Sequence, residues 1–296
     1  MKLNNLVTPL NTSELNETIV QPAEQAATFQ DYYGFNMNPF SDSVNPSFFY
    51  KTSKHEEAFM KMMMSVENDI SLGLVTGISG TGKTLLTQML LYNLNSENYK
   101  PVLVLAWPGM TKTVLLREIL MELDPEFNEK VRQTGDLLKL LHAHIIDLYK
   151  QHKKLVILID EAHFLCSDSL HILRTISNLE TPEKKLITCL LFSEDRLLRR
   201  LSHPSYESLR SRTYMKAALE ALNEKEVQQY IKFLLLVAGG SDDQFASETF
   251  SMICQASKGI CRMVNKICNN CLIEAFVLGK KHVDTTIVQK VIAEIK

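Results

Sequence analysis

A short glycine-rich stretch that ends in lysine and threonine carries the clearest chemistry in the sequence. Residues 77–84 are Gly-Ile-Ser-Gly-Thr-Gly-Lys-Thr, which match the phosphate-binding pattern G-x-x-x-x-G-K-[ST]. An apolar run at 72–76 precedes them and a helical pattern follows, so the strand–loop–helix context of the pattern is present. Because such a loop aims backbone N–H groups and a helix amino end at anions, we predict a nucleotide site.

The loop residues have distinct predicted roles. Lys83 is expected to reach the β- and γ-phosphates, and the Thr84 hydroxyl to hold Mg²⁺. The remaining contacts to ATP are expected from the loop itself, at Gly77, Ser79, Gly80, Thr81 and Gly82.

Two carboxylates end the most apolar run of the chain. Residues 155–159 are Leu-Val-Ile-Leu-Ile, typical of a strand buried on both faces, and Asp160 and Glu161 follow directly. Ligands of open α/β sheets bind at the carboxyl ends of strands. We therefore expect Asp160 to hold the Mg²⁺ shell and Glu161 to polarise the attacking water.

Ser193 ends the next apolar run, 186–192. One interpretation is a polar sensor of the γ-phosphate on a strand between the two motif strands. The other is an N-cap for the helix that starts near Asp195. The sequence leaves both open.

Three arginines are candidates for phosphate contacts. Arg210 and Arg212 stand just before the last predicted strand, where a neighbouring subunit's γ-phosphate would meet an arginine finger; the alternative is ordinary surface arginine. Arg262 opens a helix near the carboxyl terminus and is expected to swing onto the bound phosphates.

The elements that position these residues alternate short apolar strands with longer helices, which predicts an α/β fold with a parallel five-stranded sheet. The expected strands are 71–76, 102–106, 155–160, 186–192 and 213–218, and the expected helices are 54–66, 83–94, 111–123 and 135–150. A small all-helical lid is predicted from helices at 223–238, 244–257, 260–278 and 284–295. The expected domains are a disordered or loosely docked tail (1–30), the nucleotide-binding domain (31–220) and the lid (221–296).

The segment 32–50 is rich in aromatic residues and proline. Its aromatic rings are expected either to stack on adenine or to anchor the segment on the core. Nothing in the sequence separates these two interpretations.

Composition limits the class of protein. The chain has 296 residues, 45% of them hydrophobic and 22% charged, as in soluble globular proteins. A net charge of −2 gives no overall basic field for nucleic acid, although a local basic cluster lies between Arg196 and Lys216. No run approaches the roughly 20 apolar residues of a membrane span, and no signal peptide is apparent, so we expect a cytoplasmic protein. Its six cysteines are expected to be reduced, and four of them are expected to be buried core thiols rather than zinc ligands: Cys254, Cys261, Cys268 and Cys271.

The chain resembles an AAA+ ATPase in four motifs and in their order. These are the loop at 77–84, Asp160-Glu161-Ala162-His163, Leu209-Arg210-Ser211-Arg212 and Gly259-Ile260-Cys261-Arg262. The entry segment resembles that of one family, general secretion pathway protein A (ExeA-like), in Gly34-Phe35, Asn38-Pro39-Phe40 and Asn45-Pro46-Ser47-Phe48-Phe49-Tyr50. The chain departs from the family at Phe192-Ser193-Glu194-Asp195, where Gly-Gln-Pro-Glu is common, and at Cys261, where proline is usual.

The resemblance implies an ATPase that uses ATP and Mg²⁺, with Glu161 and Lys83 in hydrolysis, Ser193 as sensor 1, Arg210 or Arg212 as the finger and Arg262 as sensor 2. It further implies a homo-oligomer, ring or filament, that couples turnover to oligomerisation or to remodelling of a secretion or pilus assembly partner. The alternative is a DNA-binding ATPase that regulates target selection in transposition. The family's membrane span and peptidoglycan-binding module are not expected here, because the sequence ends after the lid.

Overall fold

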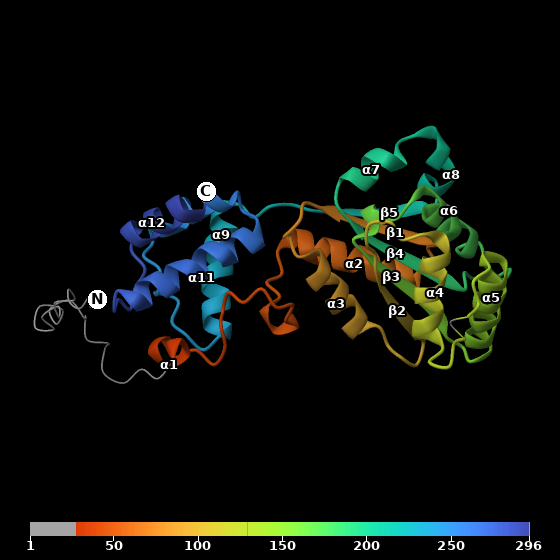
Figure 1. Cartoon of the computed structure of the whole chain (residues 1–296), viewed down its shortest axis with the longest axis horizontal. Helices are drawn as coiled ribbons and strands as arrows, with labels where there is room; N and C mark the ends of the chain where they lie inside the picture. The colour runs from red at the N-terminus through yellow and green to blue at the C-terminus, as the bar shows by residue number, and fades with distance from the viewer. Residues whose placement is uncertain (1–27, 129, 296) are drawn as a thin grey trace, which may run out of the picture.

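A parallel sheet of five strands forms the centre of the larger part of the molecule in the computed structural model (Figure 1). The structure describes residues 28–128 and 130–295, so the predicted tail lies mostly outside the described residues. The strand order is β2-β3-β4-β1-β5, and every neighbouring pair is parallel. The strands are β1 (Leu72–Gly77), β2 (Tyr99–Leu105), β3 (Lys154–Asp160), β4 (Ile187–Ser193) and β5 (Thr213–Leu219).

Helices cover both faces of this sheet, as the apolar runs of its strands require. On one face lie α2 (Ser53–Glu67) and α3 (Lys83–Asn93). On the other lie α4 (Lys112–Leu123), α5 (Thr134–Lys150), α6 (Ser167–Ile176), α7 (Arg196–Leu201) and α8 (Glu207–Arg210). Strand β3 supplies alternate residues to the two cores. Leu155, Ile157 and Ile159 pack on the side of α4 to α8, and Val156 and Leu158 pack on the side of α2 and α3.

The lid is a separate helical layer at one end of the molecule (Figure 1). It contains α9 (Glu224–Val237), α10 (Thr249–Ser257), α11 (Cys261–Val277) and α12 (Thr285–Ile295). Asn223 and Glu226 form the predicted capping box at the start of α9. Cys268 and Cys271 are buried free thiols in the lid core, as predicted, whereas Cys254 and Cys261 are only partly buried against it.

The segment before the first strand packs with the lid. It contains α1 (Phe29–Tyr33) and the short 3₁₀ helix η1 (Pro46–Phe48), and Tyr33, Phe35 and Phe40 are buried among the lid helices. The domain boundaries at residues 30 and 220 stay a prediction, but the core that this segment joins is that of the lid.

Three details differ from the expectations. Strand β2 starts at Tyr99 instead of 102, and includes Pro101, which an edge strand tolerates. Helix α10 starts at Thr249 instead of 244, because Phe245 forms a bridge to Val283. The helices α6 and α8 were not predicted as elements, and α7 was expected only as the helix near Asp195 in the N-cap interpretation of Ser193.

Candidate functional site

A pocket lies between the amino end of α3, the entry segment and the lid helix α11. Its polar wall includes Lys83, Thr84 and Glu161, and its other wall carries apolar and aromatic side chains. Val44, Phe48, Phe49, Tyr50 and Tyr230 are among the latter. The two interpretations of the aromatic segment, a stack on adenine and an anchor on the core, therefore concern different parts of it. Its first aromatic residues anchor it in the lid, and its last ones line the pocket.

The loop between β1 and α3 has the backbone that its glycines predict. Gly80 and Gly82 have φ of +85° and +95°, a region that favours glycine. At Gly77, a Cβ atom would lie 2.7 Å from the Leu219 carbonyl oxygen, so only glycine fits between β1 and β5. The buried Thr81 hydroxyl donates to the Ile78 carbonyl at 2.9 Å and closes the loop.

Lys83 is the first residue of α3 and its side chain is buried. Its ammonium group donates to the carbonyls of Gly77 (2.9 Å) and Ile78 (3.1 Å), which holds it inside the loop. Burial lowers its pKa, while the nearby carboxylates of Glu161 and Asp160 raise it. No side chain caps the amino end of α3, so its first N–H groups face the loop as an anion site.

Two oxygen donors suited to Mg²⁺ lie side by side. The Thr84 hydroxyl donates to Asp160 Oδ2 at 2.7 Å, and the other oxygen of Asp160 accepts from the Glu161 N–H at 2.9 Å. Hard hydroxyl and carboxylate oxygens are the ligands that Mg²⁺ takes in nucleotide sites. Thr84 and Asp160 therefore fit the predicted ion, which would neutralise phosphate charge when bound.

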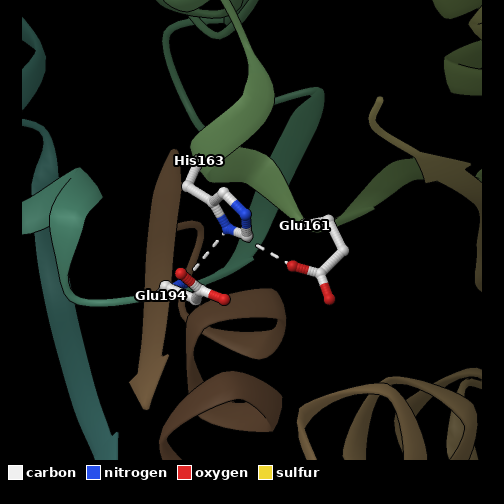
Figure 2. A group of neighbouring side chains, drawn as sticks. All are labelled: Glu161, His163 and Glu194. Atoms are coloured by element: carbon white, nitrogen blue, oxygen red, sulfur yellow. Dashed lines mark hydrogen bonds and ion pairs between the residues drawn. The ribbon is translucent and has the colours of Figure 1, made fainter. Parts of the chain in front are cut away.

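Glu161 leaves β3 with a left-handed backbone, φ +53° and ψ +34°, which is rare for glutamate and costs roughly 1–3 kcal/mol. This turn places its side chain in the pocket wall. Burial, and then the charge of Asp160, raise the pKa of Glu161. One of its carboxylate oxygens lies 3.3 Å from His163 Nδ1, in the 3₁₀ helix η2 (Ala162–Phe164), and Glu194, just after β4, offers a carboxylate within 4.8 Å (Figure 2).

Ser193 lies where the sensor interpretation requires. It ends β4, which stands between β1 and β3 in the sheet. Its buried hydroxyl donates to the Glu194 carbonyl at 2.8 Å. The N-cap interpretation is wrong, since the N-cap of α7 is Asp195 and no side chain caps this helix.

Arg262 reaches the phosphate loop from the lid. Its guanidinium donates to Ser79 Oγ at 3.1 Å, and its backbone N–H donates to the Gly80 carbonyl at 3.3 Å. A Cβ atom at Gly80 would lie 2.9 Å from both Arg262 Cβ and Ile260 Cγ2. The amino end of α11 thus lies directly on the loop.

The structure does not bring Arg210 and Arg212 to this pocket. Both precede β5, whose first residue Thr213 pairs with the first residue of β1. The phosphate loop follows the opposite end of β1. The Arg210 guanidinium donates to the Ser202 carbonyl at 3.0 Å, and Arg212 lines a separate open groove with Asp69. Neither arginine can therefore serve the pocket of its own chain.

His55 is a site residue that sequence reasoning missed. It lies on α2, where Nε2 faces the Thr81 carbonyl at 2.9 Å and Nδ1 faces the Thr52 hydroxyl at 2.7 Å. A Cβ atom at Gly82 would lie 3.0 Å from His55 Nε2. Thr52 is recognisable as a helix N-cap, but no sequence signal aims the following histidine at the loop. His163 and Glu194 were likewise given no role.

Comparisons with known proteins agree with this geometry. Residues 67–201 match the family described as AAA domain. General secretion pathway protein A of Aeromonas hydrophila is 32% identical over 251 residues, which are 85% of this chain and 45% of that protein. The chain thus spans about half the length of this relative.

Solved structures share the fold. The Aeropyrum pernix ORC2 protein superposes with a TM-score of 0.68 and 17% identity, over 88% of this chain and 72% of that one. Cdc6p from Pyrobaculum aerophilum superposes with a TM-score of 0.69 and 18% identity, over 87% of this chain and 70% of that one. Thermotoga maritima RuvB, a Holliday junction branch migration motor, superposes with a TM-score of 0.52 and 17% identity, over 83% of this chain and 70% of that one. No helix within residues 28–128 and 130–295 is both long and apolar enough to cross a membrane.

Proposed function

The chain has the AAA+ P-loop NTPase fold and is related to general secretion pathway protein A, and we propose that it binds and hydrolyses ATP with Mg²⁺. One observation carries the proposal. Thr84 and Asp160 are joined at 2.7 Å, and Thr84 lines the same pocket as the buried Lys83 and as Glu161. A site that only bound phosphate would not need that second carboxylate.

Each side chain has a task in this proposal. The loop amides and Lys83 bind the phosphates, and Thr84 and Asp160 hold the ion. Glu161 orients a water molecule for in-line attack on the γ-phosphoryl group. Ser193 and Arg262 contact the phosphates from the central strand and from the lid.

We assign the arginine finger of the proposed site to a second copy of the chain. Arg210 and Arg212 lie at the sheet edge away from their own loop, which suits residues that act on a neighbour. An arginine supplied in trans stabilises charge in the transition state of phosphoryl transfer. Head-to-tail contacts of this kind build a ring or a filament.

The process driven by this ATPase is the finer part of the proposal. The relative's name supports a role in a secretion or pilus assembly, in which turnover remodels a protein partner. A cytoplasmic location belongs to the same proposal. The alternative, regulation of transposition on DNA, is less well supported, because the basic cluster is partly used internally. Arg196 pairs with Glu194 at 3.2 Å and Arg200 donates to the His163 carbonyl at 3.0 Å.

Phosphate release from ATP tests the enzymatic proposal. The full chain is expected to release phosphate only with Mg²⁺, and Lys83→Ala is expected to lose both nucleotide binding and turnover. Lys139→Ala, an exposed lysine on α5, is the control and should match the wild type. Absence of Mg²⁺-dependent turnover in the wild type at every protein concentration would sink the proposal.

Duplex DNA separates the two biological roles. We expect the ATPase rate to be unchanged by DNA across a salt series. A rate that DNA stimulates, with stimulation falling steeply as salt rises, would favour the transposition alternative, because phosphate contacts release counterions.

A further inference from the structure

His163 lies between the ends of two adjacent strands, next to the proposed hydrolytic glutamate (Figure 2). Its Nδ1 atom is 3.3 Å from Glu161 Oε2 and also 3.3 Å from the backbone nitrogen of Glu194, whose N–H points at it. The imidazole side chain is only 1% exposed. One ring atom is thus shared by the end of β3 and the end of β4.

Counting donors and acceptors shows that Nδ1 can serve only one neighbour at a time. The Glu194 N–H needs an acceptor, whereas the Glu161 carboxylate needs a donor. A neutral ring with its proton on Nε2 accepts from Glu194. A neutral ring with its proton on Nδ1 donates to Glu161. Burial and the charge of Arg196 lower the pKa of His163, which favours the neutral ring and therefore one of these two forms.

The backbone around the ring is fixed from a third element. The His163 carbonyl accepts from Arg200 on α7 at 3.0 Å. Arg196, also on α7, lies 4.8 Å from the centre of the Phe164 ring. His163 Nε2 has no hydrogen-bond partner among the described residues. The ring is therefore held by packing and by its backbone, and Nδ1 alone makes polar contacts with the two strand ends.

We propose that His163 is a positioning residue, whose Nδ1 atom anchors one oxygen of the Glu161 carboxylate when the Glu194 N–H releases it. The other oxygen is then free to orient water. This inference rests on the proposed ATPase function. It makes the left-handed Glu161 backbone understandable, because the strained turn brings the carboxylate within reach of His163.

A metal ion is the competing use of these three side chains, because their ligand atoms lie within 4.8 Å of one another. The orientation of the Glu194 N–H argues against it. This donor points at Nδ1, the histidine atom that contacts both neighbours, and would have to be displaced.

Three substitutions test the role of Nδ1. His163→Phe fills the site without a polar atom and is expected to lower kcat about 10- to 100-fold, while affinity for a non-hydrolysable ATP analogue stays unchanged. An asparagine amide overlays Nδ1 and a glutamine amide overlays Nε2. His163→Asn is therefore expected to stay within about fivefold of the wild type, and His163→Gln to resemble His163→Phe. His171→Phe, at the histidine that stacks on Tyr206, is the control and should leave kcat unchanged.

Thermal stability and nitrogen NMR of histidine-labelled protein complete the test. If kcat follows the melting temperature of the variants instead of the position of the polar atom, the positioning role is wrong. NMR reads the ring without any turnover, with His163→Phe assigning its signals. The proton is expected on Nε2 in the free protein and on Nδ1 with the Mg²⁺–ATP analogue. A proton on Nε2 in both states overturns the inference about His163. A wild type that releases no phosphate overturns only the proposed ATPase function, because the NMR result does not depend on turnover.

Discussion

At the scale of single residues, Asp160 and Glu161 are adjacent in sequence but differ in backbone and surroundings. Asp160 ends a strand with both oxygens engaged, by Thr84 and by the Glu161 N–H. Glu161 turns into a left-handed conformation and faces the pocket. The first carboxylate is therefore suited to hold an ion, and the second to act on water.

Replacing Glu161 by glutamine separates binding from hydrolysis. We expect Glu161→Gln to lower kcat by about 100-fold or more and to leave ATP affinity within about threefold of the wild type, because only the charge on water-orienting oxygen is lost. Single-turnover kinetics and equilibrium binding measure the two quantities. Glu97→Gln, at an exposed carboxylate before β2, should have no effect. Substantial hydrolysis by Glu161→Gln would remove Glu161 from its assigned role.

His55 predicts a pH dependence of stability. Burial lowers its folded-state pKa, whereas the unfolded chain titrates near about 6.5. Below that pH the unfolded state binds a proton that the folded state resists, so the free energy of unfolding falls as the pH falls. We expect the melting temperature to drop from about pH 7.5 to about pH 5.5, and to drop less in His55→Gln, whose amide keeps the contact to Thr81. An equal drop in both proteins would contradict this assignment.

At the scale of elements, the contact between α11 and the phosphate loop ties the lid to the site. Gly80 has a φ of +85° and lies against Arg262, whereas Gly109 has a φ of +87° and nothing within 4 Å of its missing Cβ. These two glycines carry the same backbone strain on substitution but differ in packing.

Alanine at these two positions isolates the packing term. Gly109→Ala is expected to cost about 1 kcal/mol of unfolding free energy from strain alone. Gly80→Ala should cost roughly 1–3 kcal/mol more, because its Cβ pushes α11 away, and it should also weaken ATP binding. Urea unfolding of the nucleotide-free proteins gives both values. Equal losses would mean that the lid does not press on the loop.

Sequence patterns predicted the elements that carry strong local signals and missed those set by tertiary contacts. The apolar runs predicted all five strands, and the loop and Asp160-Glu161 stood out by residue type. The short helix α8 spans only four residues, too few for a periodic pattern. His55 and His163 act through neighbours distant in sequence, Thr81 and Glu194, so nothing local marked them.

At the scale of the whole molecule, the site is open to contributions from a second copy. One chain supplies the loop, the ion-binding Thr84 and the water-orienting Glu161 of the pocket. Its candidate fingers Arg210 and Arg212 precede β5, at the end of the sheet opposite the loop. A single chain therefore cannot complete the proposed site, and specific activity is expected to rise with protein concentration.

Mixing two inactive variants tests this central claim most directly. Lys83→Ala lacks a working loop but offers both arginines, and the double variant Arg210→Ala/Arg212→Ala keeps the loop but offers neither. We expect each to be inactive alone and an equimolar mixture to recover about one quarter of wild-type phosphate release, from the sites that pair an intact loop with an intact arginine. Arg199→Ala should stay active. A mixture that remains inactive, or a double variant that keeps full activity alone, would contradict an ATPase site shared between two copies.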